Sequence, residues 1–233
     1  MLIQSLESAK HTPLTQPHCD GADCAYSLTQ GTAMKILLVG ASGTLGQAVA
    51  RQLGQQHQIL AAGRSSGELR VDLTDDASVA ELFSRTGPVD AVISTTGSVH
   101  FGPLQQMTPA QFNTGLQDKL LGQVRLALAA QHHLNAGGSI TLTSGIISAQ
   151  PIRDGVNATS VNAALEGFVR AAALELLPRG LRINVVSPNV LIESMAAYGP
   201  YFPGFEAVSA QRAALAFQRA VEGIQSGETI TVW

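Results

Sequence analysis

Three glycines with the spacing of a phosphate-binding turn follow the first apolar run of the chain. The run 35–39 reads KILLV and leads directly into Gly40-Ala-Ser-Gly43-Thr-Leu-Gly46. In a strand–turn–helix unit the first glycine permits a tight turn, the second lets backbone N–H groups approach a pyrophosphate, and the third allows close helix packing. A plain tight turn is the alternative. We predict cofactor contacts from Gly40, Ser42, Gly43, Thr44, Leu45 and Gly46.

The end of the next apolar run bears on which dinucleotide would bind. It reads Ala62-Gly63-Arg64-Ser65, where NAD-binding proteins usually carry an Asp or Glu for the ribose hydroxyls. Arg64 instead offers a planar, permanently charged fork to a 2′-phosphate, and Ser65 is a further donor. The pattern favours NADP(H) over NAD(H). The alternative is a solvated loop arginine, since Ser-Ser-Gly follows it.

The order of the motifs along the chain resembles the short-chain dehydrogenase/reductase family. The motifs are GASGTLG, GRSS, VDLTD, ISTTG, TSG, AALEGFVRAAALEL and INVVSPN, and they extend from residue 35 to the C-terminus. The resemblance implies an α/β Rossmann fold: a doubly wound parallel sheet of about seven strands in the order 3-2-1-4-5-6-7, with helices on both faces. It also implies hydride transfer between a nicotinamide cofactor and a small carbonyl or alcohol substrate.

The same resemblance implies further cofactor contacts. Asp72 and Leu73 match the positions that hold the adenine, and Ser94-Thr95-Thr96-Gly97 replaces the family's Asn-Asn-Ala-Gly on the ribose side. Pro188-Asn189-Val190 replaces a Pro-Gly-Val segment whose backbone meets the nicotinamide carboxamide. Glu193 either accepts from the carboxamide NH₂ or begins a lid helix. The contacts implied in this way are Asp72, Leu73, Ser94, Thr95, Thr96, Gly97, Thr143, Pro188, Asn189, Val190 and Glu193.

The chain departs from the family at the residues that move the proton. Family members carry Tyr-x-x-x-Lys, in which the Tyr is the general acid, but alignment through Ala163-Ala164-Leu165 places Ala158 and Asn162 at those positions. The serine that polarises the carbonyl is present as Ser144, and the family's fourth-helix Asn falls on Lys119. We expect the Lys119 ammonium to bind the cofactor ribose or to stabilise the forming alkoxide beside Ser144. A solvated surface lysine is the alternative.

Two classes of function remain open. The first is an NADP(H)-dependent oxidoreductase with a non-standard active site, in which Tyr198, Tyr201 or His100 are further candidates for the acid. The second is a non-catalytic NADP(H)-binding sensor or regulatory protein. Oxidation of the cofactor by a panel of carbonyl compounds would distinguish them.

Strands alternating with helices must position these residues. We predict strands at 35–39, 57–62, 68–71, 89–93, 139–142, 181–186 and 229–232, and helices at 44–53, 75–84, 108–135, 158–177 and 209–224. Ala77, Val79, Leu82 and Phe83 are expected on the inner side of the helix 75–84. Only residues 65–68 separate the second and third strands, which is too short for a crossover helix. This alternation, with no linker that would divide it, predicts a single domain over residues 34–233.

Composition excludes several partners. The chain has 233 residues, of which 45 % are hydrophobic and 13 % charged, and the formal net charge is −3. Neither a basic stripe nor an apolar run of membrane-spanning length is present, so we expect no nucleic-acid or membrane partner. The start has no signal-peptide pattern, and a cytoplasmic protein is expected. The long helices suggest a homodimer or homotetramer.

The first 33 residues read as a polar extension that we expect to be disordered. Cys19 and Cys24 are the only cysteines, and with His11 and His18 they could in principle hold a metal. Residues 1–33 show no periodic pattern of apolar residues, which favours a disordered extension over a folded metal site. We therefore predict no metal site. Met34 precedes the first strand and is a candidate natural start.

Overall fold

The computed structural model describes residues 32–233. Two predictions, the disorder of residues 1–33 and the alternative metal site at Cys19 and Cys24, concern residues outside this range, except for residues 32 and 33. Within 32–233 no helix is both long and apolar enough to cross a bilayer. The strands are β1 (Lys35–Val39), β2 (Gln58–Gly63), β3 (Leu69–Arg70), β4 (Val89–Ser94), β5 (Leu134–Thr143), β6 (Arg182–Pro188) and β7 (Thr229–Val232).

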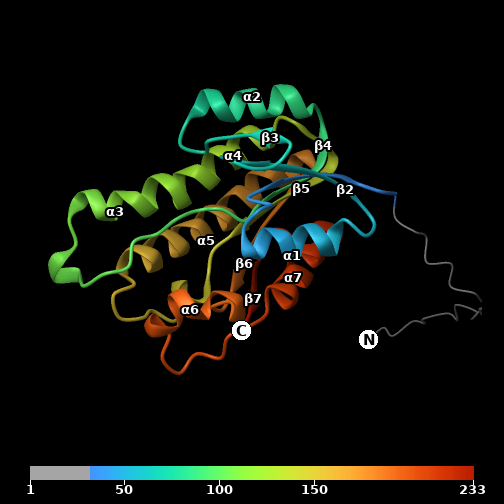
Figure 1. Ribbon diagram of the computed structural model, residues 1–233. Helices are drawn as coiled ribbons and strands as arrows, with labels where there is room; N and C mark the ends of the chain where they lie inside the picture. Colours follow the sequence, from blue (N-terminus) through green and yellow to red (C-terminus); the bar gives the residue numbers. More distant parts are fainter. Residues whose placement is uncertain (1–31) are drawn as a thin grey trace, which may run out of the picture. The chain divides into compact units, whose positions relative to one another are not determined.

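These seven strands form one parallel sheet in the order β3-β2-β1-β4-β5-β6-β7 (Figure 1). The predicted fold class and strand order are confirmed. The order reverses between β1 and β4, which pair side by side, so their carboxyl ends flank the crevice where doubly wound sheets bind ligands. No helix joins β2 to β3, as expected from the short link.

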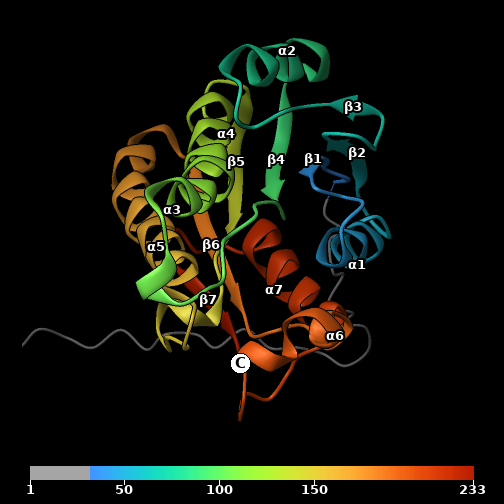
Figure 2. The same ribbon diagram turned by 60° about the vertical axis from the view of Figure 1, so that its left-hand side comes forward.

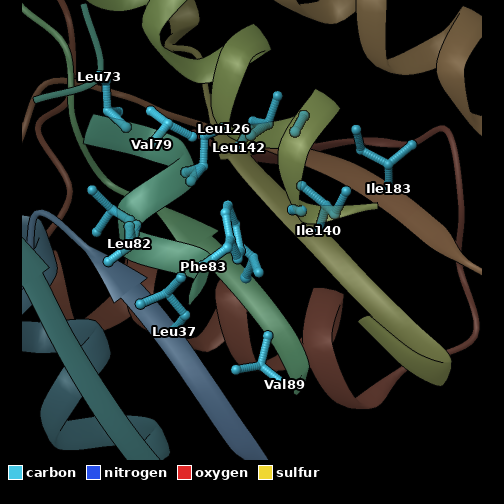
Figure 3. Close-up of a cluster of buried hydrophobic side chains, with 14 of the residues drawn as sticks. Leu37, Leu73, Val79, Leu82, Phe83, Val89, Leu126, Ile140, Leu142 and Ile183 are labelled. Atoms are coloured by element: carbon cyan, nitrogen blue, oxygen red, sulfur yellow. The ribbon is translucent and has the colours of Figure 1, made fainter. Parts of the chain in front are cut away.

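Helices cover both faces of the sheet. On one face α1 (Thr44–Leu53) packs against α7 (Ala210–Glu222), and on the other lie α2 (Asp76–Thr86), α4 (Gly122–Ala130) and α5 (Val156–Leu176). Figure 3 shows Phe83, Leu126 and Leu142 meeting in the core of the second face. Such closely packed interiors hold strand ends rigidly, which fixes the loops that follow them.

The remaining helical segments lie in the connections. They are η1 (Leu104–Gln106), α3 (Pro109–Gly115), the π-helical turn η2 (Leu116–Leu121), η3 (Ile146–Ser148), η4 (Leu177–Arg179), η5 (Ile192–Ser194), α6 (Met195–Tyr198) and η6 (Gly199–Tyr201). Figure 2 shows α6 beyond the carboxyl end of β6, the edge at which the candidate site lies.

Two predictions about helices were wrong. The helix predicted over 108–135 ends at Ala130, and β5 begins at Leu134, because Val89 pairs with Leu134 and the Asn135 amide donates to Asp90 Oδ1 at 2.7 Å. Ala77 is exposed rather than on the inner side of α2, because the side chain of Asp75 caps the helix at the Ala77 N–H and the apolar face begins at Val79. The cap at Asp75 itself was expected from the sequence.

Candidate functional site

The glycine turn forms an open cradle at the start of α1. Gly40 has φ +91°, and a Cβ on Gly46 would lie 2.0 Å from the Gly40 carbonyl oxygen. The N-cap of α1 is Gly43, whose place in the turn is held by its N–H donating to the Gly40 carbonyl at 3.1 Å. No side chain caps this helix N-terminus, so its first N–H groups remain available to an anion.

The end of β4 is bonded to this cradle. The Thr95 N–H donates to the Val39 carbonyl at 2.9 Å, and its hydroxyl lies 3.2 Å from the carbonyls of both Val39 and Gly40. Ser94 Oγ and Thr96 Oγ1 are 2.8 Å apart, and Thr143 Oγ1 donates to the Ser94 carbonyl at 2.6 Å. The three strand ends at β1, β4 and β5 are therefore fixed to one another.

The groups expected on the adenine side gather at the end of β2. Arg64 and Ser65 are exposed directly after this strand, and Leu73 is buried. Asp72 Oδ1 accepts from the N–H and the hydroxyl of Thr74 at 2.9 and 2.8 Å. These bonds lower the pKa of Asp72, and the nearby Arg64 charge lowers it further. Across the cradle, Ser66 Oγ donates to Ser42 Oγ at 2.7 Å.

Lys119 reaches the site from the π-helical turn. Its Nζ donates to the Ser144 carbonyl oxygen at 3.2 Å, and burial lowers the pKa of Lys119 to about 8. The turn passes so close to Gly97, which has φ +117°, that a Cβ there would lie 2.6 Å from Lys119 Cβ. Turns of this kind are frequent at functional sites. The structure thus places the Lys119 ammonium at the backbone carbonyl of Ser144, and the roles of both residues stay predictions.

Helix α5 carries two buried amide side chains, those of Asn157 and Asn162. Ala158, Asn157 and Asn162 are all buried. Asn157 holds the neighbouring loop, because its Oδ1 accepts from the His100 N–H at 2.9 Å and its Nδ2 donates to the Phe112 carbonyl at 2.7 Å. The amide oxygen of Asn162 is buried without a hydrogen-bond partner among the described residues. It is a polar atom that a bound ligand could satisfy.

The segment after β6 is bonded to itself and to α7. Asn189 Nδ2 donates to the Glu206 carbonyl at 2.8 Å, and the Val190 N–H donates to Asn189 Oδ1 at 2.7 Å. Both carboxylate oxygens of Glu193 accept from the Ala210 N–H at 3.0 Å, at the start of α7. Contacts of Pro188, Asn189, Val190 and Glu193 with a cofactor stay predictions, and in this structure Glu193 stabilises a helix N-terminus.

Glu166 is a residue that sequence reasoning missed. It lies on α5 one turn beyond Asn162, and its Oε1 accepts from Ser144 Oγ at 2.8 Å and from Ser148 Oγ at 2.6 Å. Its spacing of four residues from Asn162 was the available signal, since residues i and i+4 share a helix face.

The three alternative acids lie in or beside an aromatic cluster over the site. The Phe101 ring centroid is 4.8 Å from that of Tyr201 and 5.7 Å from that of Tyr198. Beside it a cavity of about 320 Å³ is lined by Ile152, Arg153, Tyr201 and Phe205, among others. His100 is half-buried in the same loop as Phe101. The rings of Phe101 and Tyr201 therefore belong to one apolar cluster with Phe202 and Phe205.

Together these features fit a nicotinamide dinucleotide. Three features lie along one edge of the sheet: the glycine turn against which α1 packs through Gly46, the uncapped N-terminus of α1, and the Asn162 amide oxygen that has no partner among the described residues. No cluster of three or more His, Cys, Asp or Glu that could hold a metal occurs within residues 32–233.

Comparisons with known proteins agree with this geometry. Residues 21–229 match the family described as enoyl-(acyl carrier protein) reductase. Versicolorin reductase 1 of Aspergillus parasiticus is 29 % identical over 199 residues, covering 73 % of this chain and 75 % of that protein. The crystal structure of the protein lin1944 from Listeria innocua is 46 % identical with a TM-score of 0.84, covering 86 % of this chain and all of that one.

A second structure bears on the cofactor. A small-chain dehydrogenase solved in complex with NADPH is 26 % identical, with a TM-score of 0.76, and the match covers 86 % of this chain and 96 % of that one. With the family match, the strand order and the glycine cradle, these likenesses place the protein: the chain belongs to the short-chain dehydrogenase/reductase family of oxidoreductases.

Proposed function

We propose that this protein is an NADP(H)-dependent oxidoreductase of a divergent subgroup, which interconverts a small carbonyl compound and its alcohol. The observation that carries the proposal is the glycine cradle followed, at the end of the next strand, by exposed Arg64. The fork of Arg64 suits a 2′-phosphate. The NADPH complex of a structural relative and the reductase names of sequence relatives support it.

The protein's own residues would divide the work as follows. The cradle and α1 would hold the pyrophosphate, and Arg64 with Ser65 the 2′-phosphate. The bound cofactor supplies or accepts the hydride at the substrate carbon. Lys119 would lie beside the oxygen that gains negative charge during reduction and would stabilise it electrostatically. Its bond to the Ser144 carbonyl oxygen holds the ammonium at the end of β5.

The substrate side is apolar and aromatic. Phe101 stacks with Tyr201 and is tilted against Tyr198. Phe101 and Tyr201 also pack against the buried side chains of Ile146, Ile147 and Phe202. Flat rings gain favourable offset contacts against such aromatic side chains. We therefore propose aromatic or bicyclic ketones as first test substrates.

A non-catalytic NADP(H)-binding protein is the second candidate. It is favoured by Ala158, which lies buried where the family carries its phenol. Incubation with NADPH and a panel of carbonyl compounds, with identification of the alcohol product, distinguishes the two. Product formation supports the enzyme, whereas tight NADPH binding without product from any compound supports the binding protein.

We also propose a homodimer or homotetramer formed through α4 and α5. These helices expose Leu128 and Leu174 at 51 % and 74 %, and a cavity of about 260 Å³ lies between them. Apolar surface of this kind favours association. Analytical ultracentrifugation of Leu128→Glu/Leu174→Glu should show a smaller species than the wild type, and an unchanged sedimentation coefficient would contradict the interface.

A further inference from the structure

The carboxylate of Glu166 is the nearest acidic group to the hydroxyl of Ser144. The Ser144 hydroxyl donates to Glu166 Oε1 at 2.8 Å, and the Ser148 hydroxyl donates to the same atom at 2.6 Å. Hydrogen bonds from hydroxyls to an ionised carboxylate are short and stronger than neutral ones. Ser144 is 3 % exposed, so its orientation is set by these protein contacts rather than by water.

The bond to Glu166 determines what Ser144 can do for a substrate. A serine hydroxyl has one proton to donate and two lone pairs that accept. While its proton points to the carboxylate, Ser144 Oγ can accept from an alcohol but cannot donate to a carbonyl oxygen. For Ser144 to donate to a substrate while it keeps its bond to Glu166, Glu166 must carry a proton and donate it to Ser144 Oγ. The protonation of Glu166 therefore controls the direction of the Ser144 bond.

The charges around this pair come from few side chains. Within residues 32–233 neither ion pair includes Glu166. Lys119 approaches from η2 and bonds the carbonyl of Ser144, and Arg170 follows one turn later on α5 itself. The segments η3, α3 and β5 bring no charged residue to α5. The other charged side chains on the segments packed against α5 are bonded elsewhere: Asp118, Arg179 and Arg182.

We propose that Glu166 and Ser144 form the proton-transfer pair of the site, in place of the phenol that α5 lacks. The inference rests on the proposed oxidoreductase function. Glu166 acts through Ser144 and is a positioning residue that also stores the proton. Ser148 supplies the second hydrogen bond that stabilises the ionised carboxylate.

The proton step balances in both directions. In reduction, hydride reaches the carbonyl carbon and the C=O π electrons move to oxygen. That oxygen bonds the proton of Ser144 Oγ, and Ser144 Oγ bonds the proton released by the Glu166 carboxyl group. An alcohol and a carboxylate result, and solvent returns a proton to Glu166. In oxidation the alcohol O–H breaks toward Ser144 Oγ while the Ser144 proton passes to Glu166.

The test compares variants with 2-tetralone and NADPH, and with 2-tetralol and NADP⁺. Glu166→Gln keeps the shape but cannot take up or release the proton, so kcat should fall on the order of a hundredfold, as for lost general acid–base groups. KM and the NADPH dissociation constant should stay within about threefold, because Glu166 touches neither ligand. The pH profile of Glu166→Gln should lack one ionisation that the wild type shows. Glu81→Gln, which removes an exposed carboxylate from α2, is the matched control.

A second pair of variants covers a folding defect in Glu166→Gln. Glu166→Asp keeps the carboxylate and should retain more activity than Glu166→Gln, and Ser144→Ala should lose as much as Glu166→Gln. Because the two residues act as a unit, the double variant should be no slower than either single one. Additive losses, or a wild-type pH profile and rate in Glu166→Gln, would overturn the inference while the enzyme itself stands. A wild type that binds NADPH but converts neither compound would overturn the proposed function and the inference together.

Discussion

Replacing Arg64 by Ala should abolish a preference for NADPH over NADH. Arg64 is exposed at the end of β2 and has no hydrogen-bond or ion-pair partner among residues 32–233, so its guanidinium is available to a 2′-phosphate. A hydrogen bond to a charged group contributes about 1.5–3 kcal/mol. At about 1.4 kcal/mol per factor of ten, the preference amounts to roughly ten- to hundredfold, and solvent exposure places it toward the lower value.

Fluorescence titration of both cofactors into wild type and Arg64→Ala measures this directly. NADPH binding should weaken by roughly tenfold or more, whereas NADH binding should change by less than about threefold, because NADH has no phosphate at this position. Arg51→Ala, which removes an exposed arginine from the last turn of α1, should alter neither. The preference should also decline as salt screens the charges. Equal affinities for the two cofactors in the wild type would refute the assignment of Arg64.

Three further substitutions test the rest of the site. Lys119→Met should lower kcat on the order of a hundredfold with little change in NADPH affinity. Because burial lowers the pKa of Lys119 to about 8, the reductase rate of the wild type should fall as the pH rises through that value. A flat pH profile in this range would contradict the role of Lys119. Gly46→Ala should abolish NADPH binding in calorimetry, since its Cβ would lie 2.0 Å from the Gly40 carbonyl oxygen; retained binding would show that the cradle is not the site. Glu193→Ala removes the acceptor for the Ala210 N–H, so the free energy of unfolding measured in urea titrations should fall by about 0.5–2 kcal/mol. The affinity for NADPH should stay unchanged, and weaker NADPH binding would instead indicate that Glu193 contacts the cofactor.

Local patterns in the sequence predicted the sheet well. The apolar run 35–39, the glycine spacing and the Asp75 cap depend on neighbouring residues, and β1, α1 and the start of α2 were correct for that reason. The helix through 108–135 was extended too far because pairing of Leu134 with Val89 is a long-range contact that no local pattern contains.

The site was predictable only in part for the same physical reason. Glycine and arginine positions follow from motif spacing, and Lys119 from alignment with a family pattern. Glu166 reaches Ser144 across 22 positions of sequence, through a bond that exists only once α5 packs beside the end of β5. The use of both Glu193 oxygens by α7 is likewise a product of tertiary packing.

The π-helical turn Leu116–Leu121 has a consequence for insertions and deletions in this chain. A π turn corresponds to one residue inserted into an α-helix, and each residue of an α-helix rotates the following ones by about 100°. Buried Gln123 and Leu126 fix the rotation of α4 after the turn. Deleting one residue within the turn would therefore restore a regular α-helix with both flanking segments in register, while shifting the side chains of the turn, Lys119 among them, relative to Ser144. Such a deletion should therefore leave the fold intact but displace the Lys119 side chain from Ser144. We expect a deletion in this turn to reduce activity more than a deletion of one residue in an exposed loop.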